Sequence, residues 1–124
     1  MHVLVMDDLT VDRFIIKKIL SPFFKVTTLS SANEAISFAL GNSFQIALLN
    51  VLIKEDMDGL VLLRKLRKVS PAPFSALAIS SHIDEGRYQK LIRNGFTEVL
   101  SKPFDLTEFM RLVKYQNDST LITS

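Results

Sequence analysis

The chain has 124 residues, 48% of them hydrophobic and 23% charged, which is typical of one globular domain and unlike a disordered chain. It contains no cysteine, which excludes disulfide scaffolds, zinc fingers and thiol nucleophiles. The formal net charge of +2 is too small to indicate nucleic-acid binding by itself. No signal peptide and no apolar stretch of membrane-spanning length is visible, so we expect a soluble cytoplasmic protein.

Five short segments rich in apolar or β-branched residues alternate with helical patterns. Strands are predicted over residues 2–6, 24–29, 44–49, 75–79 and 98–100. Apolar residues at helical spacing follow each strand, starting at Val11, Ala32, Leu62, Tyr88 and Leu106. The order βαβαβαβαβα predicts an α/β fold, a doubly wound parallel sheet of five strands with helices on both faces.

Local signals mark where the helices begin and end. Capped starts are predicted where Ser31 precedes Glu34 and where Asp105 precedes Glu108. Left-handed helix ends are predicted at Gly41 and Gly95. The apolar pattern stops at Gln116, which predicts a domain over residues 1–116 and a polar tail or linker stub over 117–124.

Polar residues stand where four of the strands end. These residues are Asp7, Asp8, Asn50, Ser80 and Lys102. The carboxyl ends of parallel strands meet at one edge of a sheet, so their side chains are expected to converge. Carboxylates hold a hard divalent cation, whereas a lysine and a hydroxyl bind phosphate oxygens. The pattern therefore predicts a small site for a cation and a phosphoryl group.

Taken singly, each residue has a structural interpretation. Asp8 is then expected to cap the first helix, Ser80 to be a small residue at a strand end, and Lys102 to be a solvated loop lysine. We interpret His2 and His82 as non-functional, because their spacing does not suggest a metal pair. The joint placement of the polar set at successive strand ends favours the functional interpretation.

In this set of motifs, over about residues 2–116, the chain resembles the receiver domain of bacterial response regulators. The matching stretches are residues 3–8, 47–50, 57–59, 79–81 and 101–104. The resemblance implies a flavodoxin-like fold with strand order 2-1-3-4-5. It also implies a role in two-component phosphorelay signalling, in which a histidine kinase or a downstream effector contacts the face made by the fourth helix, fifth strand and fifth helix.

The resemblance also implies a role for each matching position. Asp7 and Asp8 match the acidic pair that holds Mg²⁺. Ser80 matches the switch hydroxyl that turns toward the phosphoryl group, and Lys102 matches the lysine that pairs with the acceptor carboxylate. Val99 occupies the position of the aromatic switch residue, but it has no ring to swing between rotamers.

The position after the third strand should be the phosphoacceptor aspartate, and here it is Asn50. An ionised carboxylate attacks phosphorus to form an acyl phosphate, whereas an amide oxygen is neutral and its lone pair is delocalised. Asn50 also removes one charge from the cation site, although its carbonyl oxygen remains a possible third ligand. We therefore predict a degenerate receiver that is not an enzyme, requires no cofactor, binds Mg²⁺ weakly and acts through protein–protein interaction.

Such a site should be fixed in one state, with Lys102 held by Asp7 or Asp8 and Ser80 bonded to the Asn50 amide. One alternative is a competent receiver with another acceptor; Asp58 is expected to cap the third helix instead, and Asp56 lies on a loop that is one residue longer than usual.

An alternative of another class is a small flavodoxin-like enzyme or flavin-binding protein, but none of the four glycines forms a G-x-G phosphate loop. A nucleic-acid interface is a weaker alternative, because the basic run is most simply a solvated helix face. That run consists of Arg64, Lys65, Arg67 and Lys68. The sequence does not fix the oligomeric state or the identity of the partner.

Overall fold

Five parallel strands form a single twisted sheet in the computed structural model, which describes the backbone of residues 1–52 and 58–123 and the side chains of residues 1–52 and 58–114. The strands are β1 (His2–Met6), β2 (Lys25–Leu29), β3 (Ile46–Asn50), β4 (Ser75–Ser80) and β5 (Glu98–Ser101). The order β2-β1-β3-β4-β5 and the parallel pairing confirm the predicted flavodoxin-like topology. Strands β2 and β3 begin at Lys25 and Ile46 rather than at residues 24 and 44, and Asn50 and Ser80 are the last residues of their strands rather than the first after them.

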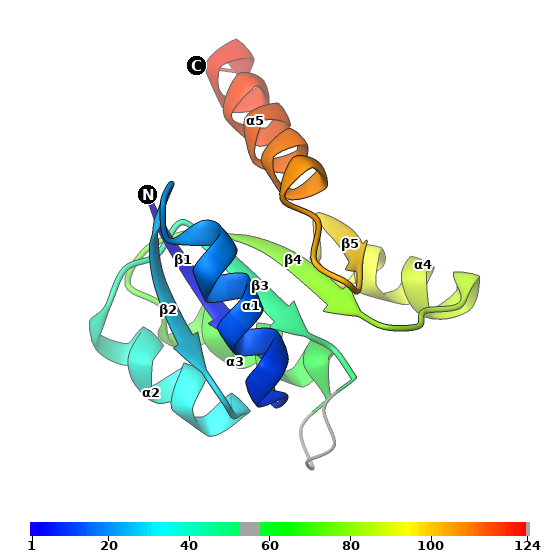
Figure 1. Ribbon diagram of the computed structural model, residues 1–124. Helices are drawn as coiled ribbons and strands as arrows, with labels where there is room; N and C mark the ends of the chain where they lie inside the picture. Colours follow the sequence, from blue (N-terminus) through cyan, green and yellow to red (C-terminus); the bar gives the residue numbers. More distant parts are fainter. Residues whose placement is uncertain (53–57, 124) are drawn as a thin grey trace.

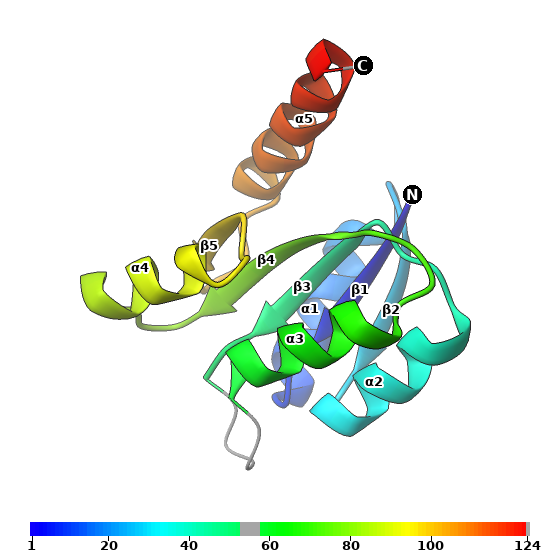
Figure 2. The same ribbon diagram turned by 180° about the vertical axis from the view of Figure 1, so that it is seen from behind.

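Five helices cover the two faces of the sheet. They are α1 (Thr10–Leu20), α2 (Ala32–Gly41), α3 (Gly59–Val69), α4 (Glu85–Arg93) and α5 (Leu106–Thr123). Helix α1 and the start of α5 lie on one face, with the rest of α5 projecting away from the sheet (Figure 1), and α2, α3 and α4 lie on the other face (Figure 2). No helix in the described part of the chain combines the length and the apolar character that crossing a membrane requires.

The alternation of side chains along the strands gives each face its own core. In β1, Leu4 and Met6 join the cluster under α2 and α3, whereas Val3 and Val5 join the cluster under α1 and α5. Strands β1, β3 and β4 are buried on both faces, which explains why their sequences read as nearly continuous apolar runs.

The predicted helix boundaries are confirmed at most positions. The Ser31 hydroxyl accepts from the Glu34 N–H at 3.2 Å, and the Asp105 carboxylate accepts from the Glu108 N–H at 3.2 Å. Gly95, with φ of +111°, has the left-handed backbone expected after α4.

The prediction at Gly41 is wrong. Helix α2 includes Gly41, and the chain leaves it through Asn42 in an extended conformation with φ of −137°. The Asn42 side-chain amide donates to the carbonyl of Phe38 at 2.9 Å, so this end is capped by a side chain rather than by a left-handed glycine.

Gly59 is required because α3 begins against the end of β3. A Cβ at this position would lie 2.7 Å from a Val51 methyl group and 2.9 Å from the Val51 Cα. Asp58, directly before it, caps α3 as predicted, since its Oδ1 accepts from the Leu60 N–H at 2.8 Å. The insertion predicted between Asn50 and Met57, including Asp56, falls on residues 53–57, outside the described residues.

The basic run of α3 is exposed, as the solvated-face interpretation expects. Arg67 in addition packs its guanidinium 4.7 Å from the centre of the Phe74 ring and donates to the Phe74 carbonyl at 3.0 Å. At the carboxyl end of the chain α5 is helical through Thr123, and the domain boundary at residue 116 stays a prediction.

Candidate functional site

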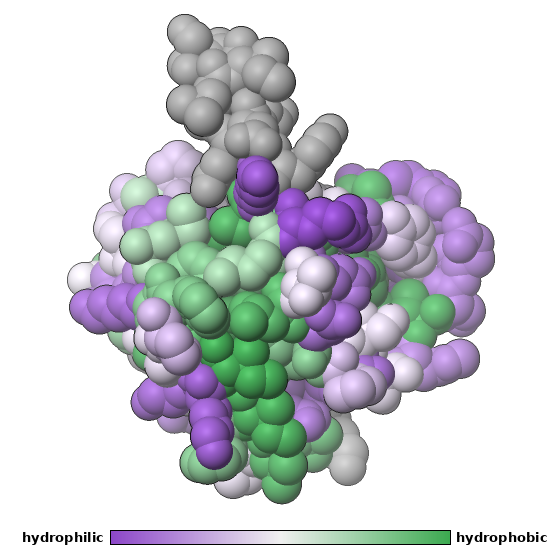
Figure 3. Space-filling model, turned by 45° about the horizontal axis from the view of Figure 1, so that its top comes forward, coloured by the Kyte–Doolittle hydropathy of each residue, from purple (hydrophilic) through white to green (hydrophobic). Residues whose placement is uncertain are grey.

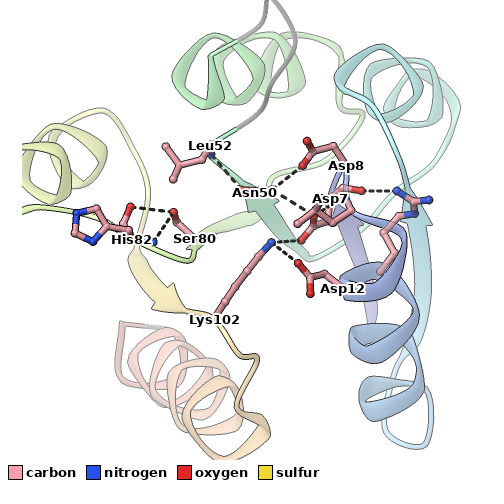
Figure 4. Close-up of polar contacts among 10 residues, drawn as sticks. Asp7, Asp8, Asp12, Asn50, Leu52, Ser80, His82 and Lys102 are labelled. Carbon is pink, nitrogen blue, oxygen red and sulfur yellow. Dashed lines mark hydrogen bonds and ion pairs between the residues drawn. The ribbon is translucent and has the colours of Figure 1, made fainter.

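The carboxyl edge of the sheet brings together four of the five polar residues that the sequence singles out. Asp7 and Asp8 follow β1, Asn50 ends β3, and Lys102 follows β5; their side chains point toward one another (Figure 4). Ser80 ends β4 at the same edge but takes part in a separate set of hydrogen bonds.

Asn50 lies at the centre of this arrangement and is only 3% exposed. Its side-chain nitrogen donates to Asp7 Oδ1 at 3.2 Å and to Asp8 Oδ1 at 2.8 Å, and its oxygen accepts from the Leu52 N–H at 3.1 Å. The partners fix the orientation of the amide, because ionised carboxylates only accept and a backbone N–H only donates. The amide therefore presents N–H groups, not an oxygen, to the acidic pair.

Asp7 is fully buried and also organises the start of α1. Its Oδ1 accepts from the Leu9 N–H at 3.0 Å, and its carbonyl oxygen accepts from the Arg13 guanidinium at 2.8 Å. Helix α1 has no side-chain cap, so the expectation that Asp8 caps it is wrong. The Asp8 carboxylate accepts from Asn50 instead.

Lys102 closes the arrangement from the side of β5. Its ammonium lies 3.0 Å from Asp7 Oδ2 and 2.7 Å from Asp12 Oδ2, and its side chain is only 13% exposed. Of the two carboxylates predicted to hold Lys102, Asp7 or Asp8, Asp7 forms the ion pair, and the interpretation of Lys102 as a solvated loop lysine is wrong. Burial alone lowers the pKa of Lys102, but the two carboxylates outweigh it and hold the pKa above its ordinary value.

Asp12, in the first turn of α1, is a site residue that no sequence motif marks. An acidic residue in the first turn of a helix is common because it complements the helix dipole, so the presence of Asp12 in the sequence does not single it out as a site residue. Asp12 supplies a third carboxylate near the site, from a helix rather than from a strand end.

These residues do not fit a divalent cation in the arrangement that the structure shows. The buried Asp7 Oδ2 accepts no hydrogen bond, but it faces the Lys102 ammonium rather than a vacant position. Asn50 turns its N–H groups toward both carboxylates of the pair. Among the described residues no three His, Cys, Asp or Glu side chains are grouped so that they could hold a metal ion.

The predicted hydrogen bond between Ser80 and the Asn50 amide is not the one that forms. The Ser80 hydroxyl donates to the His82 carbonyl at 3.2 Å and accepts from the His82 N–H at 3.3 Å. This local turn competes with longer-range partners, because it needs only residues two positions away. His82 takes part through its backbone only.

A cavity of about 180 Å³ lies between α4 and β5, next to Ser80. Val99 lines it, together with Tyr88 of α4 and the acidic residues Asp84 and Glu85. The Tyr88 hydroxyl donates to Glu98 Oε1 at 2.7 Å, and this bond is the main reason that the pKa of Tyr88 is raised. Val99 of β5 supplies no ring to this cavity; the aromatic side chain that lines it is Tyr88 of α4, which is hydrogen-bonded to Glu98 of β5.

Comparison with known proteins identifies relatives of the whole domain. The family model described as the response regulator receiver domain matches residues 3–114. A curated protein of Leptolyngbya boryana, described as an uncharacterized 14.6 kDa protein in the sodA1 3′ region, is 29% identical over 116 residues, covering 92% of this chain and 88% of its own.

Solved structures agree with this match. A response regulator receiver protein from Pseudomonas putida is similar with a TM-score of 0.80 and 25% identity, covering 92% of this chain and 95% of its own. A CheY-like receiver domain protein from Methanospirillum hungatei JF-1 has a TM-score of 0.84 at 21% identity, covering 99% of this chain and 98% of its own. The structural likenesses support the fold, and the family match favours the receiver interpretation over the flavodoxin-like enzyme.

Proposed function

Because this chain belongs to the response regulator receiver domain family, we propose that it is a receiver module of two-component signalling that works without aspartyl phosphorylation. The observation that carries the proposal is the buried amide of Asn50 at the end of β3, in the place where the family needs a carboxylate. An amide cannot form the acyl phosphate that activates a receiver. The partner then recognises one fixed state of the domain.

The contacts around Asn50 support a site held in one state. The amide satisfies Asp7, Asp8 and the Leu52 N–H at once, so rotating it would break three hydrogen bonds. Lys102, which would otherwise pair with an acceptor or its phosphate, is held between Asp7 and Asp12. A receiver of this kind can no longer form the acyl phosphate, and its lysine is no longer free to pair with the phosphoryl group.

We further propose that Mg²⁺ binds weakly and is not required. The two carboxylates of the acidic pair both accept from the Asn50 amide, and Asp7 also pairs with the Lys102 ammonium, so both are already engaged by the chain's own groups. Isothermal titration with Mg²⁺ is expected to give no saturation below the millimolar range, and tight binding would contradict this part of the proposal.

We infer that the module acts in the cytoplasm on a signalling protein, a histidine kinase or a downstream effector, through the face made by α4, β5 and α5. Receiver domains interact with signalling proteins as a class. The 180 Å³ cavity between α4 and β5, lined on one side by Asp84 and Glu85, gives this face a recess that a partner side chain can enter. Replacing Val99 by Tyr should fill the recess and weaken that interaction.

Another acceptor is not favoured at Asp58. Its Oδ1 accepts from the Leu60 N–H and from the Arg87 guanidinium, both within 2.9 Å. Burial raises the pKa of Asp58, but these two donors outweigh it and lower the pKa below the ordinary value. Its Oδ1 thus serves to cap α3 and to bind Arg87 of α4.

The decisive experiment is incubation with acetyl phosphate and Mg²⁺ followed by intact-mass measurement. The wild-type chain should gain no phosphoryl group, whereas Asn50→Asp restores the acceptor and should gain about 80 Da. A matched Asn50→Ala variant, which removes the amide without supplying a carboxylate, should stay unlabelled. Stoichiometric labelling of the wild type would overturn the proposal.

A further inference from the structure

Helix α3 presents an exposed set of cations that no carboxylate neutralises. We call this set the α3 basic face, and it consists of Arg64, Lys65, Arg67 and Lys68. The sequence has no acidic residue from position 59 to position 83, and among the described residues none of the four cations pairs with a carboxylate. The helix dipole supplies only about half a negative charge at the last turn, which is too little to balance them.

The acidic residues of the two neighbouring helices lie at the other edge of the sheet. Helix α3 lies between α2 and α4 (Figure 2). In these neighbours the acidic residues stand at the helix start, Glu34 in α2 and Asp84 and Glu85 in α4, next to the carboxyl edge of the sheet. Arg67 and Lys68 belong to the last turn of α3, toward the amino edge. The α3 basic face therefore keeps its positive charge for a partner.

A cavity of about 300 Å³ adjoins this face where the chain passes from α3 to β4. Two prolines, Pro71 and Pro73, restrict the backbone around it, and the Ser70 hydroxyl donates to the Ala72 carbonyl at 2.7 Å. The cavity is therefore already formed, so an apolar side chain can enter it without the cost of ordering a loop. The residues that line it are Arg67, Ser70, Pro71, Ala72, Pro73 and Phe74.

Arg67 joins the α3 basic face to the cavity. Its guanidinium packs 4.7 Å from the centre of the Phe74 ring and donates to the carbonyls of Phe74 at 3.0 Å and of Gly95 at 3.2 Å. These contacts fix the planar group without using a carboxylate, and its other N–H groups have no hydrogen-bond partner in the described part of the chain. A guanidinium held in this way can bind a carboxylate through two parallel hydrogen bonds.

We propose that the α3 basic face and this cavity together dock an acidic segment of a partner protein, one that carries an apolar side chain between its carboxylates. The apolar side chain enters the cavity and a neighbouring carboxylate pairs with Arg67. Further carboxylates lie along Arg64 and Lys68, which are one helical turn apart. The site uses no residue of the arrangement around Asn50, so the proposal stands whether or not that position accepts phosphate.

The charge distribution favours a short acidic segment over nucleic acid. The four cations of the α3 basic face exceed the formal net charge of +2 of the whole chain, so the rest of the molecule is net negative. It would repel a phosphodiester chain that extends beyond α3. The aromatic ring that lines the cavity, Phe74, is buried and covered by Arg67, so it offers no surface on which a base could stack.

Titration of the ¹⁵N-labelled chain with a short peptide of Asp and Glu residues around one central Phe tests the proposal. The shifts of the backbone amides should saturate and should be largest over residues 64–74. A counterpart peptide with Asn and Gln in place of the acidic residues should bind about tenfold more weakly. Raising the salt concentration from about 50 mM to about 300 mM should weaken binding severalfold, because exposed charges are screened.

Two variants and a control assign the binding to the proposed residues. Lys68→Glu should weaken binding of the acidic peptide about fivefold or more. The matched control is Lys18→Glu, the same change at an exposed lysine of α1, on the side of the molecule where Figure 3 shows a band of apolar side chains; it should leave the affinity unchanged. Ala72→Leu fills the cavity, so it should weaken binding of the Phe peptide but not of a peptide with Ser in that place.

The amide spectrum of each variant shows whether its fold is retained, so a loss of binding can be separated from unfolding. Shifts that do not approach saturation at about 1 mM peptide in about 50 mM salt would overturn the proposal. Equal losses of affinity in Lys68→Glu and Lys18→Glu would overturn it as well. A DNA duplex that binds more tightly than the acidic peptide, and that Lys68→Glu releases, would show that the α3 basic face is a nucleic-acid site instead.

Discussion

A single amide governs the polar site at the carboxyl edge of the sheet. Asn50 supplies both donors that face the acidic pair, and an aspartate of nearly the same shape would supply none. Asn50→Asp, which restores the phosphoacceptor carboxylate, should therefore destabilise the arrangement around Asp7 and Asp8. The loss of these two N–H donors in Asn50→Asp can be measured as a loss of stability.

Asn50→Asp should lower the free energy of unfolding by about 1–3 kcal/mol in the absence of divalent cations, because it buries a third carboxylate beside Asp7 and Asp8. Millimolar Mg²⁺ should restore part of the loss. Asn50→Ala should lose similar stability but gain nothing from Mg²⁺. Urea unfolding with and without Mg²⁺ measures both variants, and a Mg²⁺ response shared by the two would show that the carboxylate is not the cause.

Lys102 and its two carboxylates form a partly buried ion cluster whose members differ in burial. Asp7 is fully buried and Asp12 is 29% exposed. Lys102→Met should therefore destabilise the fold by about 3–5 kcal/mol, because it leaves Asp7 buried without a cation. Asp12→Ala should cost only about 1 kcal/mol.

The double variant that combines Lys102→Met with Asp12→Ala tests whether Lys102 and Asp12 interact. Once Lys102 is gone, the Asp12 carboxylate has lost its cation, so removing it should cost nothing more. Because the pKa of Lys102 is raised, the cluster contributes fully at neutral pH and is lost only as pH rises through that pKa, above the ordinary 10.5. Unfolding should therefore be measured at pH 7. If the stability losses of Lys102→Met and Asp12→Ala add fully in the double variant at that pH, the two residues do not interact as proposed.

At the scale of elements, His2 joins β1 to two neighbours. Its Nε2 lies 2.7 Å from the Thr27 hydroxyl of β2, and its Nδ1 lies 3.2 Å from the Ser43 carbonyl before β3. A neutral ring with the proton on Nδ1 satisfies both partners. Burial first, and then the nearby Lys25, lower the pKa of His2 below its ordinary 6.5.

Stability should therefore fall as pH drops below about 6.5, because the unfolded chain takes up a proton that the folded ring resists. The comparison is with His2→Gln, which keeps a polar side chain but cannot titrate. The wild type should lose more stability than the variant between pH 7 and pH 5. Parallel pH profiles for the two chains would show that His2 does not carry this dependence.

The sequence predicts the elements well because their signals are local. Strand runs, the Ser31 cap and Gly95 depend on residues a few positions apart, and the structure confirms them. The Lys102–Asp7 pair was predictable once strand ends were assigned to one edge. Asp12 was not, because its role depends on which side of α1 turns toward the loop after β5.

The errors at Gly41 and Ser80 have a common origin. In each case a short-range side-chain hydrogen bond competes with the predicted arrangement: Asn42 caps α2 through the Phe38 carbonyl, and Ser80 bonds the backbone of His82. Such bonds differ from the alternatives by small free energies, about 1 kcal/mol each, and residue patterns do not resolve them.

For the whole molecule, the end of the cooperative domain is set by where α5 stops contributing side chains to the core. The core under α1 and α5 includes Phe109, Leu112 and Val113, and the family model ends at residue 114. From Gln116 the sequence loses the apolar periodicity that would anchor a helix to the sheet. Most helical stability in proteins comes from such anchoring rather than from intrinsic propensity.

A chain truncated after Gln116 should therefore keep its fold, with a free energy of unfolding within about 0.5 kcal/mol of the full chain. The contrasting variant is Phe109→Ala in the full chain, which removes a fully buried ring and should cost about 3–5 kcal/mol. Urea unfolding of both, at one protein concentration, makes the comparison. If the truncation costs as much as the core substitution, residues 117–124 belong to the domain and the boundary at 116 is wrong.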